Sequence, residues 1–338
     1  MDLLPPPAPP HASPVPVSHD IDGSDRSAAA RPVAELGSRL IGTMNAVMAG
    51  KSDVVEVAVA TLLSGGHLLI EDIPGVGKTL LAQVMSHAVG GSFHRIQGTS
   101  DLLPGDITGS MVPSGQTDAM HFRRGPVFAN IVVFDELNRA TPRTQSALLE
   151  LAEEATVTID GVGHPLPDPF MLVATQNPID MAGTYGLGEG ALDRFHAVVT
   201  PGRASPAAEL EVLTGRRGRP MLDVVEPVAT LDELVAARRD VAAVQVSDAV
   251  AVYVVELLEA TRRNPRIRLG ASTRGGVAMV ALARAFAALD GRSFVTAHDV
   301  VRAAAPALAH RVAGTGASVA AGRELADDCI SQVAAPTV

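Results

Sequence analysis

The stretch His67-Leu-Leu-Ile-Glu-Asp-Ile-Pro-Gly-Val-Gly-Lys-Thr79 decides which fold the sequence predicts. It opens with a short apolar run, typical of a buried strand, and the residues after Thr79 have the apolar spacing of a helix. Between strand and helix, Gly75 and Gly77 let backbone N–H groups point at phosphate oxygens beside the positive end of the helix. A strand, a glycine-rich turn and a helix in this order predict a phosphate-binding loop.

Within this loop, Lys78 is expected to reach the β and γ phosphates of a nucleotide, and the Thr79 hydroxyl to bind Mg²⁺. The other candidate nucleotide-binding residues are Asp72, Pro74, Gly75, Val76, Gly77 and Leu80. The pattern G-x-x-x-x-G-K-[ST] begins with glycine, where this chain has Asp72. That position closes the predicted strand, so the departure discounts the motif only slightly. The alternative is a Gly-Lys-Thr turn that arises by chance, and the motifs that follow reduce its weight.

Two further apolar runs predict strands, and polar residues follow each of them. Ile131–Phe134 is followed by Asp135 and Glu136, and Phe170–Ala174 leads to Asn177. Continuous apolar runs separated by helices predict a parallel sheet covered on both faces. Ligands of such sheets bind at the carboxyl ends of the strands, where all of these polar residues lie.

The polar residues at the strand ends suit nucleotide hydrolysis. We expect Asp135 to hold Mg²⁺ and Glu136 to act as general base towards the attacking water. Two adjacent carboxylates need positive charge nearby, which a metal nucleotide supplies; the alternative is that both face solvent. Asn177 can orient the water or contact the γ-phosphate through its amide, although Asn before Pro178 is also an ordinary turn former.

Two arginines complete the candidate site. Arg194 offers a planar fork that matches phosphate and neutralises charge on the γ-phosphoryl group, and its alternative is a salt bridge with Asp193. Arg274 opens a predicted helix, where a cation opposes the helix dipole. This placement favours a functional role, in which Arg274 reaches back to the nucleotide; the alternative is an exposed arginine.

The chain divides into three regions. Residues 1–30 are predicted to be a disordered, Pro-rich tail, since they lack the apolar residues of a core. Residues 31–200 form the predicted α/β nucleotide-binding domain, and 207–330 a small all-helical domain, with a Gly/Pro/Ser-containing linker at 201–206. The segments with a helical pattern in the second domain are 207–217, 230–243, 247–263, 272–289 and 296–311.

Composition excludes several classes of protein. The 338 residues include 27 Lys and Arg against 37 Asp and Glu, and a net charge of −10 is unfavourable for non-specific nucleic-acid binding. One cysteine, Cys329, excludes an internal disulfide framework. No apolar run reaches the roughly 18–20 residues that a membrane span needs, and the N-terminus lacks the pattern of a signal peptide. We therefore expect a soluble, cytoplasmic protein without membrane insertion.

Taken in order, these motifs resemble the MoxR family of AAA+ ATPases over residues 33–315. The matching stretches are Arg95–Gly109, Arg124–Phe128, Asp135–Pro142, Gln145–Glu150, Ala174–Pro178, Gly183–Tyr185 and Leu192–Phe195. The resemblance implies the following roles: Lys78 and Thr79 as Walker A, Asp135 and Glu136 as Walker B, Asn177 as sensor 1, Arg194 as arginine finger and Arg274 as sensor 2. The chain departs from the family pattern at Asp72, Gly98, Gly188 and Gly190.

The resemblance also implies an activity and an assembly. It implies ATP and Mg²⁺ as cofactors, and a ring, usually a hexamer, because the arginine finger acts on a neighbour's nucleotide. It implies chaperone-like remodelling or maturation of partner proteins, often ones with a von Willebrand factor A domain. The helical domain would then be the lid of an AAA+ ATPase.

Two insertions are expected from the same resemblance, at roughly 102–123 and 155–168. The second is a hairpin that the residues also predict, because Val157 and Ile159 alternate with polar residues and Asp160-Gly161 favours a tight turn. The helix predicted over 141–154 begins with Thr141 as N-cap and Pro142 at its first position.

Two other functions remain open at this point. One is the ATPase motor subunit of a magnesium or cobalt chelatase, and the other is a nucleotide-bound interaction module that does not cycle. Glu136 argues against the second, since a switch without hydrolysis needs no general base. The base is expected to contact backbone near Val47–Lys51 and the lid; ATP follows from the resemblance, and GTP stays open on the residues alone.

Overall fold

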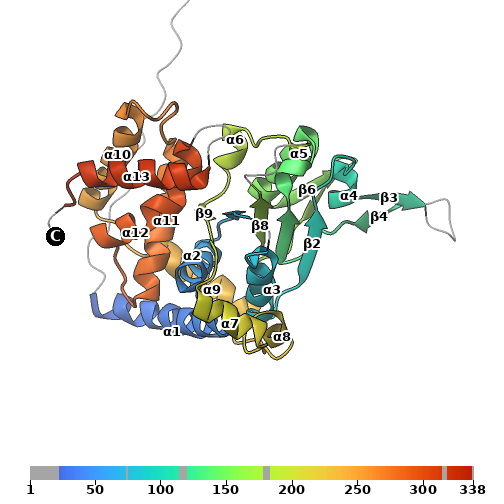
Figure 1. Ribbon diagram of the computed structural model, residues 1–338, viewed down its shortest axis with the longest axis horizontal. Coiled ribbons are helices and arrows are strands. Elements are labelled where there is room, and N and C mark those ends of the chain that lie inside the picture. Colours follow the sequence, from blue (N-terminus) through green and yellow to red (C-terminus); the bar gives the residue numbers. More distant parts are fainter. Residues whose placement is uncertain (1–22, 74, 114–119, 178–182, 314–317, 337–338) are drawn as a thin grey trace, which may run out of the picture.

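The computed structural model describes residues 23–73, 75–113, 120–177, 183–313 and 318–336 (Figure 1). At its centre lies a five-stranded sheet with the strand order β2-β5-β8-β1-β9, in which all neighbouring strands are parallel. The strands are β1 Leu68–Glu71, β2 Phe93–Gln97, β5 Ile131–Asp135, β8 Met171–Gln176 and β9 Ala197–Val199. This confirms the predicted parallel sheet and its three predicted strands.

Alternate side chains of the sheet enter two different cores. Leu68 and Ile70 of β1 pack with helices on one face, whereas Leu69 between them packs on the other face. The same alternation continues in the neighbouring strands, because successive side chains of a strand point to opposite faces. Helices on both faces therefore exclude water from the sheet, and its carboxyl edge remains for ligands.

The helices of the first domain surround this sheet. They are α1 Gly23–Val47, α2 Ser52–Leu63, α3 Lys78–Ala88, α5 Pro142–Glu154 and the short α4 Pro104–Thr108 and α6 Glu189–Leu192. Helix α5 begins as predicted, with the Thr141 side chain accepting a hydrogen bond from the backbone N–H of Thr144. None of the described helices combines the length and apolar character needed to cross a bilayer.

The predicted tail 1–30 is too long at its C-terminal end. Helix α1 begins at Gly23, so residues 23–30 are helical, and only residues 1–22 of the proposed tail lie outside the described residues. The apolar spacing that predicted a helix starts only at Val33, but the preceding Ala-rich residues also favour helix. A prediction based on apolar periodicity missed residues 23–30, because they favour helix but have no apolar face.

Both predicted insertions form antiparallel hairpins. Strands β3 Gly109–Pro113 and β4 Met120–Arg124 extend from the body of the molecule, and β6 Thr156–Ile159 pairs with β7 Val162–Pro165 (Figure 1). The Phe122 ring of the first hairpin stacks on the His164 ring of the second, with centroids 4.3 Å apart. The two hairpins therefore touch each other.

The predicted helical segments of the second domain are confirmed, except that the first, predicted over 207–217, ends at Leu213. Helices α8 and α13 are additions. The helices are α7 Pro206–Leu213, α8 Arg219–Leu222, α9 Leu231–Ala243, α10 Asp248–Arg263, α11 Thr273–Leu289, α12 Ala297–Val312 and α13 Val319–Gln332. We call them the lid helices. One apolar core runs without interruption from α1, α2 and the sheet into α9–α12. The lid is therefore packed against the first domain.

Candidate nucleotide-binding site

The loop between β1 and α3 has the backbone of a phosphate-binding turn. Gly75 and Gly77 adopt φ values of +87° and +92°, which residues with a side chain rarely adopt. Gly77 is the N-cap of α3, so the first N–H groups of that helix face the loop. Val76 lies in this turn and Leu80 in the first turn of α3, and both line an adjoining cavity. Pro74, also predicted as a binding residue, lies outside the described residues.

Lys78 spans the ends of two strands. Its Nζ donates to the carbonyl oxygens of Asp72, at 2.6 Å, and Gln176, at 3.2 Å. Burial lowers the pKa of Lys78, and the negative charges of Asp72, Asp135 and Glu136 oppose this shift. A phosphate group at the loop would add further negative charge beside this half-buried ammonium group, and so would stabilise its charged form.

Asp135 receives three donors at the end of β5. Its Oδ2 accepts from the Thr79 hydroxyl at 3.0 Å and pairs with Arg95 Nε at 2.6 Å, while Oδ1 accepts from the Thr175 hydroxyl at 3.2 Å. Hydroxyl and carboxylate oxygens are the ligands that Mg²⁺ takes, so Thr79 and Asp135 together fit this metal. Arg95 is not among the predicted site residues, because β2 was not predicted.

Glu136 has an unusual backbone. It is a non-glycine residue at φ +56° and ψ +52°, a left-handed conformation that costs about 1–2 kcal/mol. Its N–H donates to Thr175 Oγ1, and its Oε2 accepts from Gln97 Nε2, both at 3.0 Å. The Arg139 guanidinium also lies 3.1 Å from Oε2. This turn carries the carboxylate beyond the strand end, next to Asp135.

Gly98 explains why the chain at Glu136 can pass so close to β2. Its N–H donates to the carbonyl oxygen of Asp135 at 2.7 Å, and a Cβ at this position would lie 2.3 Å from the carbonyl oxygen of Glu136. Any side chain would collide with this backbone. The absence of a side chain at Gly98 therefore permits the close approach of the two strands.

Asn177 and Asp72 occupy the other strand ends. Asn177 is buried, and its carbonyl oxygen accepts from Asn138 Nδ2 at 3.4 Å. The Asp72 carboxylate accepts from the N–H groups of Ile73, at 2.7 Å, and of Gly202 in the linker to the lid. Asp72 therefore holds the linker against the phosphate loop through its side chain and holds Lys78 through its carbonyl.

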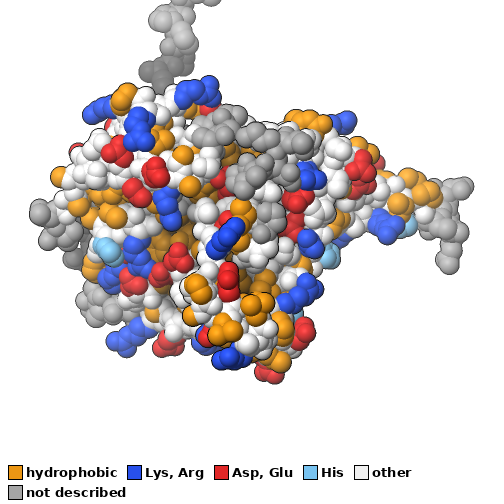
Figure 2. All heavy atoms as spheres, in the orientation of Figure 1, with side chains coloured by type: hydrophobic (Ala, Val, Ile, Leu, Met, Phe, Trp, Pro, Cys, Tyr) orange, Lys and Arg blue, Asp and Glu red, His pale blue; other side chains and the backbone are white. Residues whose placement is uncertain are grey.

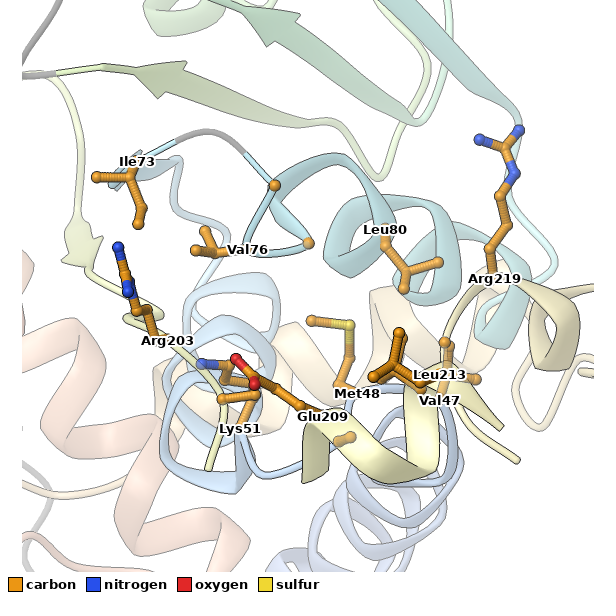
Figure 3. A pocket seen from close by; sticks show the side chains of 16 residues that line it. Val47, Met48, Lys51, Ile73, Val76, Leu80, Arg203, Glu209, Leu213 and Arg219 are labelled. Carbon is orange, nitrogen blue, oxygen red and sulfur yellow. The ribbon is translucent and has the colours of Figure 1, made fainter. Parts of the chain in front are cut away.

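A cavity of about 560 Å³ lies beside the loop (Figure 3). Val76 and Leu80 lie on one side of it, and Met48 and Leu213 on the other. Its other lining residues come from the phosphate loop, from the end of α1 and the turn after it, from the linker and from the first lid helices: Val47, Ala49, Lys51, Ile73, Gly75, Gly77, Arg203, Ala204, Glu209, Val212, Gly218 and Arg219. The residues 47–51 that we expected near the base are thus beside the loop.

Apolar side chains also gather on the outer surface over α7 and α8, next to this cavity (Figure 2). Leu213 is 84% exposed, and Leu210 and Val224 are more than half exposed. One side of the cavity is therefore formed by a lid segment whose apolar residues are only partly covered.

Arg194 and Arg274 lie together, in a different place. Arg194 Nε donates to Glu153 Oε2 at 3.0 Å, and Arg274 pairs with the other oxygen of the same carboxylate. Arg194 lines a second cavity, of about 820 Å³, between α5 and the segment 186–194. Neither arginine is among the described residues that line the cavity beside the phosphate loop. Asp193, the alternative partner of Arg194, pairs instead with Arg311.

Comparisons with known proteins agree with this arrangement. Residues 67–197 match the ATPase family associated with various cellular activities (AAA), and residues 259–332 match the AAA lid domain. The crystal structure of a candidate ATPase from Cytophaga hutchinsonii superposes with a TM-score of 0.82 at 29% identity, covering 93% of this chain and 99% of that one.

Relatives by sequence identify the branch within this family. The Bacillus subtilis protein named "Uncharacterized protein YeaC" is 42% identical over 80% of this chain and 84% of its own length. "Chaperone MoxR1" of Mycobacterium tuberculosis is 36% identical over 81% of this chain and 74% of its own length. A parallel-sheet AAA domain, a helical lid and this degree of identity lead to one conclusion: the chain belongs to the MoxR family of AAA+ ATPases.

Proposed function

We propose that this chain hydrolyses ATP with Mg²⁺, as one subunit of a ring that remodels or matures partner proteins. One observation carries the proposal: Thr79 Oγ1 lies 3.0 Å from Asp135 Oδ2, which joins the phosphate loop to the acidic strand end. Lys78 and Glu136 lie at the same edge of the sheet, because they follow β1 and β5. These are the residue types that bind, polarise and hydrolyse a triphosphate.

The residues would divide the work as follows. Thr79 and Asp135 hold Mg²⁺, which when bound neutralises charge on the phosphate oxygens. Lys78 exchanges its carbonyl partners for phosphate oxygens, and Asn177 orients the water. Glu136 accepts a proton from that water, and its contacts with Gln97 and Arg139 must loosen for it to do so.

The position of Arg194 supports a ring. Arg194 lines a cavity away from the phosphate loop, so within one chain it has no nucleotide to act on. On a ring it would serve the nucleotide of the next subunit, where a guanidinium stabilises charge on the transferred group. Arg274 shares Glu153 with Arg194, which favours a role beside Arg194 over contact with the nucleotide of its own chain.

The proposed client is another protein. The name of the M. tuberculosis relative, a chaperone, supports chaperone-like work on proteins. A hexameric ring, a partner with a von Willebrand factor A domain and a cytoplasmic location follow from the family resemblance and the sequence. The choice of ATP over GTP rests on the family resemblance.

Two substitutions test the proposed chemistry. Glu136→Gln removes the general base and keeps the shape of the side chain, so we expect phosphate release to fall about 100-fold or more with ATP binding retained. Lys78→Ala should lose both binding and hydrolysis. Binding is measured with a fluorescent ATP analogue, and Glu226→Gln, an exposed acid outside the site, serves as control. Normal turnover by Glu136→Gln would refute the assigned mechanism.

A further inference from the structure

Asp193, the residue directly before Arg194, is held by two lid helices. Its carboxylate accepts from the Ser272 hydroxyl, at 2.9 and 3.0 Å, and from Arg311 Nε at 2.8 Å. Arg311 Nη2 also donates to the backbone carbonyl oxygen of Asp193 at 2.8 Å. Ser272 is the N-cap of α11, and Arg311 lies in the last turn of α12. The lid therefore forms hydrogen bonds with both the side chain and the main chain of Asp193.

Arg311 is built into this place. Its side chain is only 4% exposed, and its Nη1 contacts the carbonyl oxygen of Ala307 and His310 Nε2. Burial lowers the pKa of Arg311, and the Asp193 carboxylate opposes that shift. A Cβ on Gly275 would lie 2.8 Å from Arg311 Cδ, so the absence of a side chain there leaves room for the guanidinium. A buried charge of this kind is tolerated only with its partner in place.

The residues on either side of Asp193 and Arg194 are tied to the lid as well. Phe195 is fully buried, and its carbonyl oxygen lies 3.1 Å from His310 Nε2 of α12. Glu189, at the start of α6, pairs with Arg268, in the loop before α11. The backbone that carries Arg194 is thus bound to the lid before, at and after this residue.

We propose that Arg311 and Ser272 are positioning residues for Arg194, so that the lid of one subunit sets the rate of hydrolysis in the next subunit. This inference rests on the proposed function, because Arg194 must act on a neighbour's nucleotide. The lid is placed to sense the nucleotide of its own chain, since Val212 and Leu213 of α7 line the cavity beside the phosphate loop. A misplacement of a reacting group by about 1 Å can cost about 100-fold in rate.

Mixed rings separate the two subunits on which each side chain acts. The donor subunit carries Glu136→Gln, which binds ATP without hydrolysing it and keeps Arg194. The acceptor carries Arg194→Ala, which has a working site and no finger. We expect each alone to be nearly inactive and the mixture to release phosphate, because the donor's Arg194 serves the acceptor's nucleotide; an arginine finger is worth about 1000-fold or more. If the mixture stays inactive, the proposed action on a neighbour fails, and this inference with it.

Arg311→Met is then added to one partner at a time. In the donor it should lower the recovered rate by about tenfold or more, because Arg194 is misplaced. In the acceptor it should change the rate by less than about twofold, since that subunit supplies no finger. Equal losses in both placements would show a general structural defect, and no loss in the donor would show that Arg194 needs no support from Arg311. Either result overturns the inference.

Two further variants guard against misfolding. Arg302→Met removes another ion-paired arginine of α12, which contacts Asp290 and Glu56, and in the donor it should leave the recovery unchanged. Ser272→Ala removes the hydroxyl from Asp193 and leaves Arg311 in place, and it should lower the donor's recovery by about threefold. Entry of each donor into mixed rings is followed by sedimentation velocity. A Ser272→Ala donor with full recovery would count against the inference.

Discussion

The phosphate loop with its acidic strand end and the region of Arg194 are built in different ways. Lys78, Thr79, Asp135 and Glu136 follow strands of one parallel sheet, and the backbone alone brings them to one edge. Arg194 lies just after the four-residue helix α6. Its guanidinium pairs with Glu153, which is distant in the sequence. The first region can therefore be complete in a single chain, and under the proposed function the second depends on the lid and on a neighbour.

This difference has a consequence for regulation. A site fixed by strand ends and glycine turns has few ways to change without unfolding the sheet. A site fixed by ion pairs with the lid changes whenever the lid moves, because these contacts reach across domains. We infer that nucleotide binding is the more constant property of this chain and that hydrolysis is the adjustable one.

Dilution is the strongest way to break this comparison. Below the concentration at which rings assemble, we expect turnover per subunit to fall about 1000-fold, because Arg194 no longer reaches a nucleotide. Affinity for a fluorescent ATP analogue should stay the same across the series, since the binding site is complete in each chain. Sedimentation velocity gives the assembly state, and Arg194→Ala, slow at every concentration, is the control. Turnover that is independent of dilution would contradict the distinction.

Acid should weaken the region near Arg194 through three histidines, of which His67 and His310 are buried and His196 is half-buried. His196 follows this segment, His310 adjoins Arg311, and His67 contacts both β8 and α5. His67 Nδ1 accepts from the Leu172 N–H, so its Nε2 donates to the carbonyl oxygen of Ala152, which leaves the ring neutral. Burial lowers the pKa of His196 to about 4 and also lowers the pKa of His67 and His310.

The unfolded chain binds protons near pH 6.5 and the folded chain only at lower pH, so stability present above pH 6.5 is lost as pH falls towards 4. For His196 alone the shift amounts to about 3 kcal/mol, since each pKa unit corresponds to about 1.4 kcal/mol. Between pH 7.5 and pH 5 about 2 kcal/mol of this stability should be lost. Urea unfolding followed by circular dichroism at both pH values measures the loss. His196→Gln should reduce the dependence of the free energy of unfolding on pH, whereas substitution of the exposed His298 by Gln should not. A free energy of unfolding that does not change with pH in the unaltered chain would refute the role of these histidines.

Gly98→Ala tests the first region, the phosphate loop with its acidic strand end. The added Cβ would lie 2.3 Å from the carbonyl oxygen of Glu136, so the two strands must separate. We expect turnover to fall roughly 100-fold through misplacement of the carboxylate. Binding of the ATP analogue should change little, because Lys78 and Thr79 lie on another strand–helix unit. Gly105→Ala is the matched control, since a Cβ there meets no atom within 4 Å; an active Gly98→Ala protein would show that the close approach is dispensable.

The parts of the fold that the sequence predicted are those with continuous burial. All the side chains of β1 and β5 are buried, so their apolar runs are unmistakable. Strand β2 exposes most of its side chains and β9 has only three residues, and neither leaves a readable pattern. Because β2 was missed, so were Arg95 and Gln97, which contact the two acids at the end of β5.

For the candidate site as well, the sequence predicted residues in a local pattern and missed contacts between residues distant in the chain. The roles expected at the phosphate loop could be stated because glycine, lysine and threonine stand next to one another in the sequence. The contact of Arg311 with Asp193 joins residues 118 positions apart, and no local pattern marks it. The hydrogen bond from the Gly202 N–H to the Asp72 carboxylate joins residues 130 positions apart. In the sequence, Asp72 could be recognised only as a departure from the glycine that begins the loop pattern.

Asp72→Gly, which restores that glycine, gives the smallest expected effect and the sharpest test of the boundary between the two regions. It removes the acceptor of the half-buried Gly202 N–H. A fully buried unpaired donor costs about 1–3 kcal/mol, so the cost here should lie at the lower end of that range. Lys51 still holds the linker through the carbonyl oxygens of Pro201 and Gly202, so the linker stays near the loop.

We therefore expect the affinity for the ATP analogue to fall by roughly fivefold, which is about 1 kcal/mol, with turnover of the bound nucleotide unchanged. Asp72→Asn keeps a carbonyl oxygen as acceptor and should bind almost as tightly as the unaltered chain. If Asp72→Gly binds ATP equally well, the linker is not coupled to the loop by this carboxylate. The lid would then have to sense the nucleotide through the apolar side of the cavity alone, at Val212 and Leu213.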